Sequence, residues 1–212
     1  MSTPTARAES LLEALGAETV PHPGGTLLAH LRRVRSRLAL WNARPALQLA
    51  GLCHAFYGTD GFPTGLLPLD RRSELEGIIG AEAESIVYFY GACDRKATYP
   101  TLAEHDSDFR DRFTGRSHPP DTRLRRDFAE LTAANELDLT DHDPAFRDRH
   151  GADLLALFHR FRPLLSQAAW RDCLTLDFTG QSRHIRISDT SSGLADGPGG
   201  SGDHDHRRNH DH

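Results

Sequence analysis

The chain has 212 residues, a net charge of −5 and a mean hydropathy of −0.53. This length suits one domain with appendages, and the intermixed acids and bases give none of the basic surface typical of nucleic-acid-binding proteins. No apolar run reaches the roughly 18 residues that a membrane-spanning helix needs, and residues 1–8 lack the apolar segment of a secretory signal, so we expect a cytoplasmic protein.

Helical patterns dominate the first half of the chain. Residues 5–16 predict a short amphipathic helix that ends at Gly16, and a Pro/Gly loop follows at 21–25. Residues 26–41 predict a strong helix, because its apolar residues form one continuous stripe: Leu27, Leu31, Val34, Leu38 and Trp41. Residues 45–57 are apolar nearly all round, which is typical of a central helix.

The next segments alternate between buried helix and polar loop. A helix is predicted over residues 70–79, where Asp70 can cap the first turn, and another over 81–92. Residues 94–120 predict mostly loop with one short helix near 102–113.

Asp121 or Thr122 begins a predicted helix that runs to about Leu137, and residues 143–149 predict a turn. The remaining structured predictions are helices over 151–161 and 163–173, or one helix kinked at Pro163, and then a hairpin or extended arm over 175–187. Because residues 188–212 are rich in Gly, Ser, Asp and His and have little to bury, we expect them to be a disordered tail.

These patterns together predict an all-α fold, a single helical domain over residues 1–187 with the tail after it. The cysteines Cys53, Cys93 and Cys173 lie far apart without a CxxC pair, so we expect three reduced, mostly buried thiols.

Three polar side chains fall at positions expected to be buried. His30 adjoins the apolar stripe of its helix, and His54 shares a face with Leu47 and Ala50. In the later helix, Asn135 follows Leu124, Phe128 and Leu131 on the apolar stripe. Burying imidazole or amide groups is costly unless their polar atoms find partners, so these residues predict a site.

The spacing of His30 and His54, the latter after the run AGLC, resembles the HD superfamily and most closely its (p)ppGpp hydrolase domains. The segment LTAANELD at 131–138 is similar to the helix that carries the last metal ligand of that family. The segment HAFYGTDGF at 54–62 also resembles an uncharacterised HD-related family. The resemblance covers residues 22–137 and implies an HD-like helical bundle.

The chain departs from the HD pattern at two positions. Ala55 stands where the doublet has Asp, and Asn135 stands at the position of the last ligand. The resemblance therefore implies a divalent metal ion (iron, manganese or zinc) held by His30 and His54, with Asp60 as a third ligand from a shifted position. Amides are poor ligands for transition metals, so Asn135 is expected to bind substrate or to orient a histidine.

The implied function is metal-dependent hydrolysis of a small, phosphorylated or nucleotide-like metabolite. Asp60 and Tyr57 are the candidate catalytic residues, and Thr59, Asn135 and His22 the candidate substrate-binding residues. An iron-dependent oxygenase and a catalytically inactive ligand-binding protein are the alternatives. The partners implied are a small-molecule substrate and, as an open option, a second copy in a homodimer; nucleic acid and membrane are not expected.

For each candidate there is a purely structural alternative. The histidines can be hydrogen-bonded core residues, Asp60 a turn residue before glycine, and Tyr57 an aromatic residue that packs at a helix end. The histidines outside this group are expected on the surface: His105, His118, His142, His150, His159 and His184.

Overall fold

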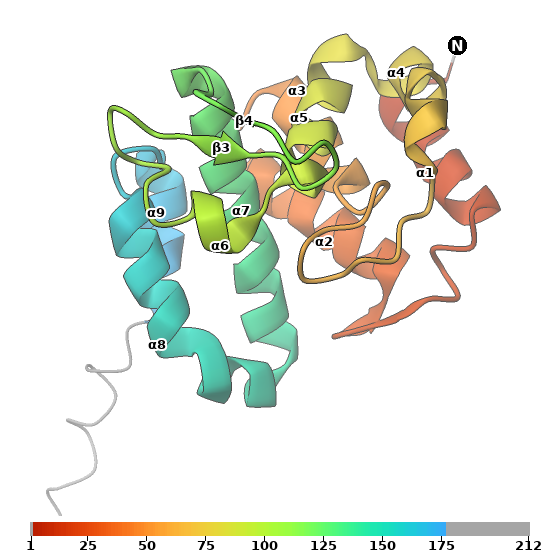
Figure 1. Cartoon of the computed structure of the whole chain (residues 1–212). Coiled ribbons are helices and arrows are strands. Elements are labelled where there is room, and N and C mark those ends of the chain that lie inside the picture. Colours follow the sequence, from red (N-terminus) through yellow and green to blue (C-terminus); the bar gives the residue numbers. More distant parts are fainter. Residues whose placement is uncertain (1, 177–212) are drawn as a thin grey trace, which may run out of the picture. The chain divides into compact units, whose positions relative to one another are not determined.

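The computed structural model describes residues 2–176, and within them the protein is all-α, as predicted (Figure 1). The α-helices of this part are α1 (Pro4–Ala14), α2 (Leu27–Leu40), α3 (Pro45–Cys53), α4 (Arg72–Ile79), α5 (Ala81–Ala92), α6 (Arg95–Thr98), α7 (Thr122–His142), α8 (Pro144–Phe161) and α9 (Gln167–Cys173). Two short 3-10 helices, η1 (Leu69–Arg71) and η2 (Leu174–Leu176), complete the helical structure of this part. The tail predicted at 188–212 and most of the arm predicted at 175–187 lie outside the described residues.

Two small antiparallel ladders join the helices. Strand β1 (Pro21–His22) pairs with β2 (Gly25–Thr26), with Pro21 opposite Thr26. Strand β3 (Phe109–Arg110) pairs with β4 (Ser117–His118), with Phe109 opposite His118. The first ladder forms where the sequence predicts a Pro/Gly loop, and it places His22 directly before α2.

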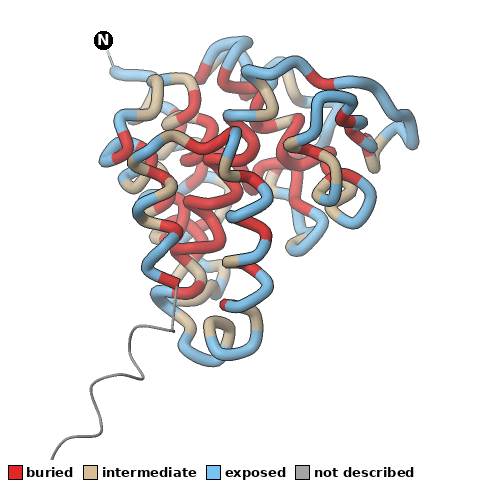
Figure 2. The backbone as a smooth tube through the Cα atoms, turned by 90° about the vertical axis from the view of Figure 1, so that its left-hand side faces the viewer, coloured by how far each residue is buried: buried red, intermediate tan, exposed pale blue. Residues whose placement is uncertain are grey.

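The core lies among α2, α3, α5 and α7, which pack against one another. The predicted stripe of α2 is confirmed, because all five of its residues are buried: Leu27, Leu31, Val34, Leu38 and Trp41. The predicted central helix, α3, is buried along most of its length. Figure 2 shows the buried residues on the inner segments and the exposed ones on the outer turns.

The longest helix, α7, crosses between α2 and α8 (Figure 1). The Asp121 side chain caps it by accepting the backbone N–H of Leu124 at 3.0 Å, as the sequence predicts. The helix continues past the predicted end at Leu137 to His142, so Asp138 also faces the interior. Asp143 then caps α8 at Phe146 N, which starts α8 earlier than predicted.

The helix predicted near 102–113 is absent from the described structure. Two turns follow α6 there, and then comes strand β3. Phe109 drives this arrangement, because its buried ring stacks on Phe89 at a centroid distance of 3.8 Å. The Arg125 side chain also donates to the carbonyl of Glu104, which holds this segment against α7.

Asp70 does not cap an α-helix as predicted; it lies in η1, and α4 begins after Arg71 without a side-chain cap. The predicted break after Ile79 is confirmed, since Gly80 adopts φ of 86°, a conformation that favours glycine. None of the helices in residues 2–176 is long and apolar enough to cross a membrane.

Candidate functional site

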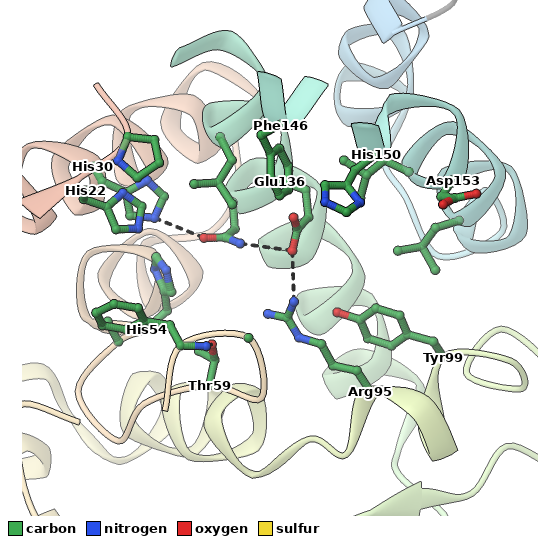
Figure 3. A pocket seen from close by; sticks show the side chains of 18 of the residues that line it. His22, His30, His54, Thr59, Arg95, Tyr99, Glu136, Phe146, His150 and Asp153 are labelled. Atoms are coloured by element: carbon green, nitrogen blue, oxygen red, sulfur yellow. Dashed lines mark hydrogen bonds and ion pairs between the residues drawn. The ribbon is translucent and has the colours of Figure 1, made fainter. Parts of the chain in front are cut away.

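A cavity of about 730 Å³ lies between the histidine-bearing segments and α8 (Figure 3). This volume is in the range of small-molecule sites, roughly 300–1,000 Å³. Five of the seven predicted site residues line it: His22, His30, His54, Thr59 and Asn135. Most of the remaining lining comes from α6, α7 and α8, namely Arg95, Tyr99, Glu136, Leu139, Phe146, His150, Asp153, Leu154, Leu157 and Arg160.

His30 lies in the first turns of α2 and is 1% exposed. Its Nδ1 is 2.6 Å from Asp138 Oδ2, and its Nε2 is 3.1 Å from Asn135 Oδ1. An ionised carboxylate only accepts hydrogen bonds, so Nδ1 carries a proton and donates it. Both edges of the ring are therefore fixed by side chains of α7.

The hydrogen bonds of Asn135 set the orientation of its amide. Its Nδ2 donates to Glu136 Oε1 at 3.2 Å, and Arg95 Nη1 donates to the same oxygen at 3.1 Å. Reversing the amide would turn its oxygen toward the Glu136 carboxylate, which has no proton to offer. Oδ1 is thus the atom that faces His30.

The contact between His30 Nε2 and Asn135 Oδ1 has a chemical consequence. If His30 is neutral with its proton on Nδ1, two lone pairs face each other. The contact is favourable only with a cation, either a second proton on the ring or a metal ion. Two metal ligands with bonds of about 2.1 Å at a right angle lie about 3 Å apart, so the observed separation suits either cation.

His54 directly follows α3 and is 3% exposed. Its Nδ1 donates to the carbonyl oxygen of Gly51 at 2.8 Å, which places the lone pair on Nε2. Burial, followed by the charge of the neighbouring His30, lowers the pKa of His54 to about 3. The ring is therefore neutral at pH 7, and its Nε2 makes no hydrogen bond with any residue in 2–176.

His22 completes a cluster of three imidazoles. Its ring stacks on that of His30 with a centroid distance of 4.1 Å, while the ring of His54 approaches His30 edge-on at 5.3 Å. Burial, and then His30, lower the pKa of His22 to about 4. Arg33 holds the hairpin in place by donating to the carbonyl oxygen of Pro23 at 3.0 Å.

Asp138 carries the charge behind His30. Arg33 donates to both of its carboxylate oxygens, from Nε at 2.8 Å and from Nη2 at 2.9 Å. Although burial acts in the opposite direction, the hydrogen bonds from His30 and Arg33 lower the pKa of Asp138 to about 2. One network of side chains thus runs along the cavity, in the order Arg33, Asp138, His30, Asn135, Glu136 and Arg95.

Asp60 and Tyr57 do not line this cavity. Asp60 is exposed, and its carboxylate accepts the backbone N–H of Arg95 at 3.1 Å. Tyr57 is buried, and its hydroxyl donates to Glu84 at 2.9 Å. Both side chains have hydrogen-bond partners within the chain, and neither joins the histidine cluster.

The turn after α3 explains this separation. Gly58 adopts φ of 68°, and a Cβ there would lie 2.7 Å from the carbonyl oxygen of Pro63. The sharp turn brings Thr59 to the cavity and leaves Asp60 exposed. The Thr59 hydroxyl accepts the backbone N–H of Phe62 at 3.0 Å, so it also closes the turn.

No three His, Cys, Asp or Glu side chains in residues 2–176 are grouped in a way that could hold a metal ion. The possible donors at the histidine end are the imidazole nitrogens of His22, His30 and His54 and the amide oxygen of Asn135. His30 and His54 fit the role of ligands, because each has its Nδ1–H anchored to an oxygen and its Nε2 on the opposite edge. Asp60 does not fit as the third ligand.

The side of the cavity formed by α8 was missed from the sequence. His150 was predicted on the surface, but it is only half-exposed, lines the cavity and packs its ring on Phe146 at 4.7 Å. The signal was the pair Asp143-Pro144, which caps α8 and begins it seven residues earlier than predicted. With that start, four cavity residues fall at helical spacing: Phe146, His150, Asp153 and Leu157.

Part of the chain matches a known family model. Residues 11–95 are similar to the family described as a domain of unknown function, DUF6817. The matched range includes His22, His30, His54 and Arg95 but ends before α7, which carries the partners of His30. Searches of curated proteins and of solved structures found no match.

Proposed function

We propose that this protein is a metal-dependent hydrolase of a small phosphorylated or nucleotide-like metabolite, and that the reaction takes place in the cavity. The same proposal includes a relation of this chain to the HD superfamily, which its sequence resembles. The observation that carries it is the pair His30 and His54. In each ring Nδ1 is anchored to an oxygen, by Asp138 in His30 and by the Gly51 carbonyl in His54, and Nε2 lies on the opposite edge, as is usual for a histidine ligand.

The chain's own residues have distinct roles in this proposal. His30 and His54 would hold the ion, with Asp138 and the carbonyl oxygen of Gly51 fixing the two rings. When bound, the ion supplies an activated water and polarises the phosphoryl group. Asn135 orients His30 and offers its amide oxygen to the same position.

Anionic parts of a substrate meet arginines on the other side of the cavity. Arg95 lines it from α6, and the exposed Arg160 lines it from α8. Glu136 neutralises part of the charge of Arg95, so the arginine is held in place before substrate arrives. Guanidinium groups suit phosphate oxygens because their N–H groups form a planar fork.

Hydrolysis of 4-nitrophenyl phosphate and of nucleoside monophosphates, with manganese, iron or zinc present, tests the proposal. The native chain should turn over at least one of these, and His30→Ala or His54→Ala should lower kcat/KM at least about a hundredfold through loss of the ion. His105→Ala is the matched control, since His105 is exposed outside the cavity. Turnover that survives both cavity substitutions, or none with any ion, would contradict the proposal.

A second candidate is a non-catalytic protein that binds a small ligand in the same cavity. It is favoured by the contacts of His30, since both of its ring nitrogens face acceptor oxygens and a doubly protonated ring satisfies both. Ala55 and Asn135 also leave the histidine end without a carboxylate ligand. Ligand binding by metal-free protein, with no turnover of any phosphate ester, would support this candidate.

A further inference from the structure

The cavity has a second end that the histidine cluster does not explain. Figure 3 shows Tyr99 and Arg95 on one side of the open space and Phe146 and His150 on the other. Tyr99 follows α6 and lies one helical turn after Arg95, so both side chains reach the cavity from the same short segment. Their chemistry defines what this end can hold.

The hydroxyl of Tyr99 is buried and has no hydrogen-bond partner among residues 2–176. Buried polar atoms are nearly always paired, so an unpaired one that borders a cavity indicates a group supplied from outside the chain. Burial raises the pKa of Tyr99 well above its usual value, so the hydroxyl keeps its proton and can donate it in a hydrogen bond.

Arg95 contributes further unused donors beside this hydroxyl. A guanidinium has five N–H donors, and that of Arg95 makes one ordinary hydrogen bond, to Glu136, and one long contact of 3.5 Å with the Tyr90 hydroxyl. Arg95 lines the same cavity as Tyr99 and His54.

The opposite wall, on α8, combines apolar side chains with the charged Asp153 and Arg160. Leu154 and Leu157 line it beside Phe146, and the ring of His150 packs on that of Phe146. Such a wall gains free energy by covering an apolar or aromatic group, about 25 cal/mol for each Å² removed from water. A bound molecule with an apolar part would place that part here.

We propose that Arg95 and Tyr99 form an oxyanion-binding subsite, and that the ligand is a phosphate monoester whose organic group is apolar or aromatic and packs against α8. This inference rests on the proposed function for the reaction, but the binding step does not need the metal ion. Tyr99 acts as a specificity-determining residue, because its hydroxyl is paired only when an acceptor oxygen lies beside Arg95.

Calorimetric titration of the full-length chain in the presence of a chelator tests this, with phenyl phosphate and methyl phosphate as probes. Phenyl phosphate should bind at least about tenfold more tightly than methyl phosphate, since only its ring covers the α8 wall. Tyr99→Phe should weaken phenyl phosphate binding about tenfold, because the substitution removes one hydrogen bond to a charged oxygen. Arg95→Lys should also weaken it, through loss of the planar fork.

Tyr88→Phe is the matched control, because its hydroxyl is already paired with Asp111 outside the cavity. Equal affinity for the two probes, or equal effects of Tyr99→Phe and Tyr88→Phe, would overturn the inference, as would no binding of either probe. If the protein binds phenyl phosphate but takes up no metal ion, the proposed hydrolase function is contradicted and the proposed subsite is supported. If the protein hydrolyses phosphate esters and Tyr99→Phe leaves that turnover unchanged, the proposed subsite is contradicted and the hydrolase proposal stands.

Discussion

Asp138 is the residue on which the position of His30 depends most. Replacing it with Asn removes the charge that Arg33 and His30 share, so we expect a loss of about 2–4 kcal/mol in the free energy of unfolding at pH 7. Metal affinity should fall about 10–100-fold as well, because the anchor of a ligand is weakened. Urea unfolding and metal titration of Asp138→Asn measure both effects.

The stability that Asp138 provides should depend on pH. Its pKa is about 2 in the folded protein and about 3.9 in an unfolded chain, so the unfolded state binds the proton more readily. The contribution is complete above pH 5 and is lost as the pH falls toward 2. The difference in unfolding free energy between the native chain and Asp138→Asn should therefore shrink over that range; a difference that stays constant would contradict this account.

His54 and His22 should stay neutral at pH values at which a free imidazole becomes protonated. Their pKa values, lowered to about 3 and about 4, predict that neither ring titrates between pH 8 and pH 5. Imidazole nitrogen NMR shifts measure this directly, with free imidazole as the reference. Protonation of either ring near pH 6.5 would show that the cluster is open to water and not arranged as described.

At the scale of single residues, the sequence predicted which side chains are buried better than it predicted their functional roles. The inward positions of His30, His54 and Asn135 follow from helical spacing and are confirmed. Asp60 could not be placed, because its direction depends on a tight turn at Gly58 that spacing alone does not define. Asp138 was missed because the apolar stripe was followed only as far as Asn135.

The close approach of α5 to the turn after α3 should be sensitive to one methyl group. A Cβ at Gly91 would lie 2.9 Å from the carbonyl oxygen of Gly58, a backbone atom that cannot move aside easily. We expect Gly91→Ala to lower the free energy of unfolding by about 1–3 kcal/mol. In the control Gly77→Ala, at an exposed position of α4, a Cβ meets nothing within 4 Å, and stability should rise by about 0.5–1 kcal/mol. Urea unfolding of both variants distinguishes these outcomes.

Among the elements, periodic segments were predicted well and irregular ones were not. The helices α2, α3, α5 and α7 have long apolar patterns, and their existence is confirmed. Residues 102–113 were assigned to a helix although Phe109 packs there as part of a strand. The reason is a tertiary contact with Phe89, which no local pattern contains.

All three thiols of the chain should report unfolding of the whole molecule. Cys53, Cys93 and Cys173 are free and buried, as predicted, and burial raises the pKa of Cys93 and of Cys173 to about 12. Their reaction with an aromatic disulfide reagent at pH 8 should be slow in the native protein and should accelerate with urea in step with unfolding. Rapid native modification of any one of them would mean that its surroundings open locally.

At the scale of the whole molecule, hydrophobic periodicity predicts the all-α class. The composition adds little to this prediction. The cavity could not be predicted, because its walls come from segments as distant as His22 and Arg160. The sequence located the histidine end through buried polar residues. The α8 end consists of residues with ordinary surface chemistry, which only the fold brings together.

The central claim is that a metal ion lies at His30 and His54, and elemental mass spectrometry of the purified chain tests it most directly. His204, His206, His210 and His212 would be replaced with Asn beforehand, so that the C-terminal tract does not contribute metal. We predict about one equivalent of a divalent metal, lost in His30→Ala and in His54→Ala and retained in His105→Ala. No metal after loading with manganese, iron or zinc, or metal that both cavity substitutions leave in place, would contradict the claim and favour a doubly protonated His30.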